Sequence, residues 1–140
     1  MKNALLLIAL CGISLFASCV SAKHIIVNYQ DSSDSTGTII YSPTSALQGA
    51  VMTVDDKLLV DKKVVKKVTI KNVPVGTHRI HFSADSWAYR DKLDQSDSIK
   101  ITKGAEVAKI VNTPPFGTGY YVVYGISSLV SLITTLYILR

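Results

Sequence analysis

Cysteine is scarce in this sequence, and both of its cysteines, Cys11 and Cys19, lie near the start of the chain. A disulfide scaffold is therefore excluded for residues 23–113, which have to be held together by packing. Charge is also scarce at both ends of the chain, where apolar residues concentrate around a more polar middle. This distribution predicts a water-soluble domain between targeting or membrane segments.

The usual motifs of catalysis are missing as well. The sequence contains no glycine-rich phosphate loop and no HExxH or GxSxG motif. His78 and His81 are three positions apart, so on one strand they would point to opposite faces, which does not favour a shared metal ion. His78 falls on the same face as Ile80 and Phe82, which predicts a hydrogen-bonded residue at the edge of the core. We expect no catalytic residues, no cofactor and no metal.

The first 22 residues have the three-part layout of a secretory signal. A short positive start is followed by the apolar run 4–16, which is too short to span a bilayer, and then by small residues up to Ala22. This pattern predicts a signal peptide over residues 1–22. Two processing routes remain open: cleavage before Lys23, or lipidation of Cys19, because residues 16–19 resemble a bacterial lipobox.

The C-terminal segment 120–139 carries no charge and is rich in Leu, Ile, Val and Tyr. As a helix it would be about 30 Å long, which is the thickness of the hydrocarbon core. We therefore predict a single transmembrane helix over 120–139, preceded by a proline-containing linker over 114–119. An alternative is a glycolipid-anchor signal. With an exported N-terminus, the domain would lie outside the cytoplasm, in the periplasm or the extracellular space.

Small hydroxyl residues repeat every four positions in this helix, at Ser127, Ser131 and Thr135. Small residues at this spacing allow two helices to approach closely, so this face is a candidate for self-association or for docking to another membrane helix. In the alternative interpretation, the hydroxyls hydrogen-bond to the backbone of their own helix.

The middle of the chain, residues 23–113, consists of short β-branched or apolar runs separated by turn signals. This pattern predicts an all-β fold, a small antiparallel β-sandwich with seven or eight short strands. The last two strands are expected to pair with each other around a tight turn at Lys103 and Gly104. The predicted strands cover residues 24–29, 38–41, 50–54, 58–60, 68–73, 78–83, 98–102 and 105–111.

Three segments of this domain resemble the PEGA domain and its prealbumin-like relatives. They are the strand 37–43 that ends in Ser-Pro, the segment 49–57 with a Gly-Ala step and an Asp-rich turn, and the segment 73–80 with a Val-Pro-Val-Gly-Thr-His turn. The chain departs from the family pattern in the longer spacing between Pro43 and Gly49. The resemblance implies a small β-sandwich of bacterial envelope proteins without catalytic residues.

Two features of the domain are candidates for surface contact. A lysine run would meet an anionic surface such as lipid headgroups or acidic glycans, or it would protect an edge strand from unwanted pairing. Trp87 and Tyr89 would contact a partner if exposed, whereas in the alternative interpretation the tryptophan plugs one end of the sandwich. The lysines are Lys62, Lys63, Lys66 and Lys67.

These features together predict a non-enzymatic, membrane-anchored protein of the cell envelope whose β-domain serves for binding or structural support. Its partners would be the membrane, another envelope protein or an anionic glycan or lipid, and a homo-oligomer could form through the helix. The net charge of +5 also suits nucleic acid, but the export signal argues against that partner. The alternative function is that of a phage unimolecular spanin, which links outer and inner membranes during lysis and requires a lipidated Cys19 instead of a free Lys23.

Overall fold

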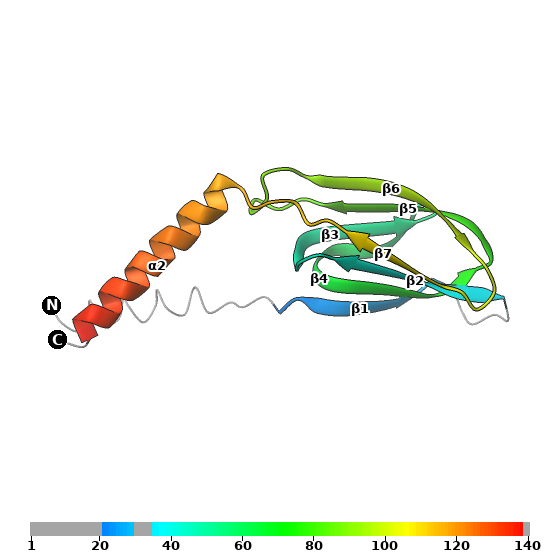
Figure 1. Ribbon diagram of the computed structural model, residues 1–140, viewed down its shortest axis with the longest axis horizontal. Helices are drawn as coiled ribbons and strands as arrows, with labels where there is room; N and C mark the ends of the chain where they lie inside the picture. The colour runs from blue at the N-terminus through cyan, green and yellow to red at the C-terminus, as the bar shows by residue number, and fades with distance from the viewer. Residues whose placement is uncertain (1–20, 30–34, 139–140) are drawn as a thin grey trace.

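The computed structural model describes residues 21–29 and 35–138, and within them it contains seven strands followed by one long helix (Figure 1). The predicted mostly-β fold with a C-terminal apolar helix is thereby confirmed. The predicted signal peptide, including Cys19, lies outside the described residues except for its last two positions. The elements are β1 Lys23–Asn28, β2 Thr36–Pro43, β3 Leu47–Val54, β4 Lys57–Pro74, β5 Gly76–Ala84, β6 Leu93–Ile101, β7 Glu106–Val111 and α2 Thr118–Ile138.

The longest strand, β4, folds back on itself. It has 18 residues, and a straight strand of that length would measure roughly 60 Å. However, the ring of His78 contacts both ends of the strand: Nδ1 lies 2.6 Å from a carboxylate oxygen of Asp55, just before β4, and Nε2 lies 2.8 Å from the carbonyl oxygen of Pro74, its last residue. The strand therefore reverses direction, and its hydrogen-bonding partners change at Val65, which aligns with both Leu47 of β3 and Lys23 of β1.

This reversal folds one continuous sheet into two layers. The first half of β4 pairs with β3, and the order continues through β5 to β6; the second half pairs with β1 and β2, and β2 pairs with β7. The expectation that all pairs are antiparallel is wrong, because β1 runs parallel to β4 and β2 runs parallel to β7. The short strands expected at 58–60 and 68–73 are the two halves of β4.

The predicted hairpin of the last two strands is also wrong. The turn at Lys103 and Gly104 connects β6 to β7, but β6 pairs with β5 and β7 pairs with β2. The turn instead carries the chain from one layer to the other. The prediction was wrong because the residue types of this turn are also those of a tight hairpin.

The side chain of Asp97 in β6 joins the edges formed by β6 and β7. Its carboxylate accepts a hydrogen bond from the hydroxyl of buried Tyr41 in β2 at 3.1 Å and lies 2.5 Å from Nζ of Lys109 in β7. Burial alone would raise the pKa of Asp97, but the hydrogen bonds from Lys109, Tyr41 and Gln95 and the charge of Lys109 outweigh it and hold the pKa below its usual value. Asp97 is therefore ionised at neutral pH and ties the two layers together.

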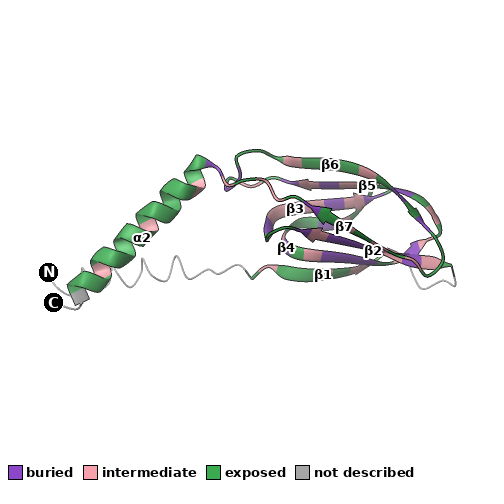
Figure 2. Cartoon of the chain, viewed as in Figure 1, coloured by how far each residue is buried: buried purple, intermediate pink, exposed green. Residues whose placement is uncertain are grey.

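The core lies between the layers and follows the two-residue period of the strands. In β5, the side chains of His78, Ile80, Phe82 and Ala84 are buried and the intervening ones are not. The rings of Tyr41 and Phe82 meet across the layers with centroids 5.6 Å apart. Figure 2 shows that burial is concentrated in the strands, whereas α2 is exposed along most of its length.

Bulges with left-handed backbone angles produce the curvature of the sheet. Gly49 has φ +64°, Lys62 has φ +44° and Asn72 has φ +58°, and the register of the neighbouring pairs shifts beside each of them. An extra residue in one strand increases twist and bends that strand. Lys62 lies in the reversal of β4, so one bulge helps to form the bend.

We expect Gly49→Ala to destabilise the domain far more than Gly104→Ala. Both glycines have left-handed φ, which costs an alanine about 1–2 kcal/mol. A methyl group at Gly49 would also lie 2.2 Å from the carbonyl oxygen of Asp85, whereas none of the described atoms lies within 4 Å at Gly104. Urea unfolding of the detergent-solubilised chain measures both losses, and equal losses would contradict the close approach at Gly49.

Acid should weaken the domain partly through Asp97. Because its pKa is lower in the folded state than in the unfolded chain, its contribution is present above the unfolded value of about 3.9 and is lost as the pH falls below that value. Asp97→Asn should therefore unfold at lower urea concentration at pH 7 and show a smaller further loss between pH 5 and pH 3 than the unmodified chain does. Asp56→Asn, in an exposed turn, is the control. If the stability of Asp97→Asn depended on pH as that of the unmodified chain does, this role of Asp97 would be refuted.

Candidate functional site

The chain segment before α2 is fixed to the loop between β5 and β6. The backbone N–H of Gly117 donates to the carbonyl of Ala88 at 2.8 Å, and that of Arg90 donates to the carbonyl of Pro115 at 3.0 Å. Gly117 is suited to this contact because a Cβ there would lie 3.2 Å from the carbonyl oxygen of Tyr89. The predicted linker is thus part of a packed structure, which we call the junction and define as residues 85–92 together with 114–120.

Aromatic rings continue the junction into the helix. The ring of Tyr89 stacks on Phe116 with centroids 5.9 Å apart, and Phe116 stacks on Tyr120 at 4.1 Å. Tyr120 in turn lies 6.2 Å from Tyr124 and 6.4 Å from Trp87. The stack connects a side chain of the β-domain to the first turns of α2. The sequence had not pointed to Phe116 as a site residue; its position directly after two prolines is the one local feature that could have done so.

Tyr89 and Trp87 have different environments, although they are two positions apart. Tyr89 is buried: its hydroxyl accepts a hydrogen bond from the backbone of Gln48 at 2.8 Å and donates one to the carbonyl of Ala46 at 3.4 Å. Burial raises its pKa, although the hydrogen bond from Gln48 opposes this. Trp87 is 67% exposed. Tyr89, not the tryptophan, therefore closes this end of the β-domain, and Trp87 remains accessible.

The lysine run occupies the reversal of β4. Lys62, Lys63 and Lys66 are exposed and Lys67 is half-buried. Within residues 21–29 and 35–138, none of these four has a carboxylate within ion-pair distance. At the other end of the β-domain, where the two ends of β4 meet, Asp55 receives hydrogen bonds from the His78 ring, the backbone N–H of Arg79 and the hydroxyl of Tyr29.

The contacts of His78 agree with a hydrogen-bonded residue at the edge of the core. Burial would raise the pKa of Asp55, but the hydrogen bonds from His78, Arg79 and Tyr29 outweigh it and lower the pKa. Both ring nitrogens of His78 lie within hydrogen-bonding distance of an oxygen atom, Nδ1 of the Asp55 carboxylate and Nε2 of the Pro74 carbonyl. In the described part of the chain, no group of three or more His, Cys, Asp or Glu side chains could hold a metal ion.

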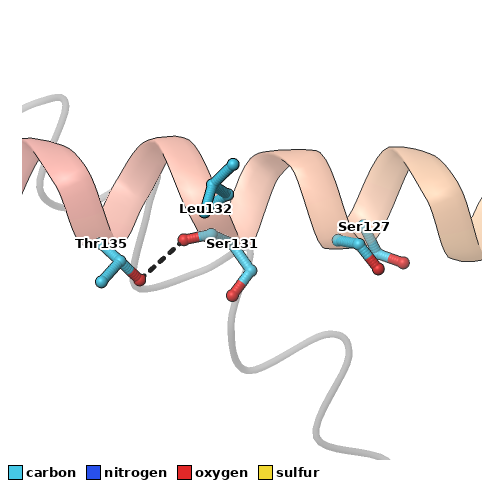
Figure 3. A pocket seen from close by; sticks show the side chains of 5 residues that line it. Ser127, Ser131, Leu132 and Thr135 are labelled. Atoms are coloured by element: carbon cyan, nitrogen blue, oxygen red, sulfur yellow. Dashed lines mark hydrogen bonds between the residues drawn. The ribbon is translucent and has the colours of Figure 1, made fainter.

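The helix α2 is long and apolar enough to cross a membrane. Its segment Thr118–Tyr137 has a mean hydropathy of 1.4 and none of it is buried against the β-domain. Figure 3 shows Ser127, Ser131 and Thr135 along one side of the helix, beside a shallow groove. The hydroxyls of Ser127 and Thr135 donate to carbonyl oxygens within the helix, at Val123 and Ser131, which satisfies these donors without a partner helix.

Comparison with protein-family models and with curated proteins finds no match to this chain.

Replacing the buried hydroxyl of the junction should destabilise its attachment to the β-domain. Tyr89→Phe leaves the N–H of Gln48 without its acceptor, and an unsatisfied buried donor costs about 1–3 kcal/mol. The loss is measurable by urea unfolding. Tyr121→Phe, in which the altered side chain is 61% exposed on α2, should be nearly neutral. If the two variants were equally stable, the hydroxyl of Tyr89 would have no structural role.

Proposed function

We propose that this chain is a non-enzymatic protein of the bacterial cell envelope, held in the membrane by α2, with a PEGA-like β-domain outside the cytoplasm that serves for binding or structural support. One observation carries the proposal: α2 exposes a broad stripe of apolar side chains. Leu129, Ile133 and Leu136 are each at least 60% exposed. Exposing such a stripe to water is unfavourable, and lipid removes that cost.

The side of the membrane on which the β-domain lies is inferred from the N-terminal apolar run and from α2. The apolar run at 4–16 with its positive start is typical of an export signal. An exported N-terminus and a single span leave the β-domain on the outer side of the membrane. The uncharged sequence of α2 and the tyrosines near its start suit a helix that crosses the hydrocarbon core with its beginning at an interface.

The PEGA-like assignment is supported by the turns of the β-domain. The positions that carry the resemblance are turns and bulges: Gly49 has left-handed φ, Asp55 and Asp56 form the turn between β3 and β4, and Gly76 with φ +149° starts β5. The packing between the layers leaves the outer faces and the two ends of the β-domain for contact with partners. Such a partner would be another envelope protein or an anionic glycan or lipid.

Membrane extraction tests this function. The full chain, expressed in a bacterial host, should stay with the membranes in alkaline carbonate and dissolve only in detergent, because α2 crosses the bilayer.

Protease added to spheroplasts should digest the β-domain while a cytoplasmic marker stays intact. Mass spectrometry of the mature N-terminus should show loss of Met1. Recovery of the intact chain from the soluble cytoplasmic fraction would contradict the proposal.

A further inference from the structure

The reversal of β4 and the junction lie at the same end of the β-domain. The hydroxyl of Tyr89 in the junction binds backbone groups at Ala46 and Gln48, on either side of the first residue of β3. That residue, Leu47, pairs with Val65 in the reversal, and Ala50 pairs with Lys63. Figure 1 likewise places the folded end of β4 on the side of the β-domain that faces α2.

The reversal carries a concentrated positive charge. We call Lys62, Lys63 and Lys66 the lysine bend; all three are exposed, and none has an ion-pair partner among the described residues. Asp61 belongs to the bend itself. In the junction, the carboxylate of Asp85 is paired with Nζ of Lys92 at 2.6 Å, and Asp91 lies beside Arg90. The charge of the lysine bend therefore remains largely uncompensated.

An exposed tryptophan lies at the same end. Trp87 is 67% exposed, and its ring centroid lies 6.4 Å from that of Tyr120 in the first turn of α2. Tryptophan and tyrosine favour the boundary between hydrocarbon and headgroups. A membrane entered by α2 thus has its surface near Trp87 and Tyr120, and the end of the β-domain that carries the lysine bend faces that surface.

We propose that the lysine bend binds the anionic phospholipid headgroups of the membrane that α2 enters, so that the β-domain rests on the bilayer instead of standing free of it. This inference depends on the proposed function, because it requires α2 to be inserted. The packed junction supports it: hydrogen bonds from Gly117 and Arg90 fix the β-domain to the start of the helix, which holds the lysine bend close to the surface. An acidic glycan is the competing partner.

The only tryptophan of the chain, Trp87, provides the measurement. The full chain is placed in nanodiscs of phosphatidylcholine and phosphatidylglycerol in equal amounts, with bromine on the acyl chains of only one of the two lipids. Quenching of Trp87 then reports which lipid gathers at this end of the β-domain. Brominated phosphatidylglycerol should quench more strongly at low salt, and the difference should disappear at high salt, because ions screen the attraction.

Removing the lysines should remove this preference. Each lysine near an anionic surface strengthens binding about fivefold, so the triple variant K62Q/K63Q/K66Q should weaken the contact on the order of 100-fold. Its quenching by the two brominated lipids should be equal. The matched control is K71Q/K100Q/K103Q, which removes the same charge from exposed positions at the other end of the β-domain; it should keep the preference.

The possible results separate this inference from the proposed function. If neither lipid quenches Trp87, the β-domain does not rest on the bilayer and the inference is wrong; carbonate extraction of the same chain then shows separately whether α2 is inserted. If both lipids quench it equally in the unmodified chain at low salt, α2 is inserted but the lysine bend does not bind anionic lipid. A loss of preference in both triple variants would mean that net charge alone acts. If a soluble anionic polysaccharide binds through the lysine bend while no lipid preference exists, the partner is a glycan and the inference is wrong.

Discussion

The ring of His78 holds together two points that a straight strand would separate by roughly 60 Å. It contacts the carboxylate of Asp55 before β4 and the carbonyl of Pro74 at the end of β4, so the 18 residues of this strand fold back. Both layers take a strand from β4, and the core between them exists because of the reversal. The hydrogen bonds from Tyr41 and Lys109 to Asp97 then join the remaining edges.

The same reversal brings the lysine bend and the start of α2 to one end of the β-domain. The chain turns at Lys62 beside the start of β3, and Tyr89 binds the backbone at that start. Because Tyr89 also stacks on Phe116, and Phe116 on Tyr120, the helix leaves the β-domain at the end where the lysines are. The pairing of β3 with β4 thus brings the lysine bend close to the start of α2, although they are separated by more than fifty positions in the sequence. Their proximity is the basis of the proposed contact with lipid.

Local signals predicted the strands, the turns and the apolar helix, because alternation and turn chemistry are encoded within a few residues. Long-range pairing could not be predicted in this way. The sequence at Lys103 and Gly104 is typical of a hairpin turn, but β6 pairs with β5 and β7 pairs with β2, both of which are distant in the sequence from this turn. Likewise, Trp87 and Tyr89 lie two positions apart in the same polar loop, and the contacts of Tyr89 with Ala46 and Gln48 show which ring is buried.

The distance between the two halves of β4 tests the central claim most directly. Spin labels on cysteines replacing Leu58 and Lys71, both exposed, can be measured by pulsed electron paramagnetic resonance in the full chain, with Cys11 and Cys19 replaced by serine. A strand that folds back brings the labels far closer together than the roughly 43 Å of thirteen residues in a straight strand. A distance near that straight-strand value would contradict the reversal, and with it the shared core and the common location of the lysine bend and α2.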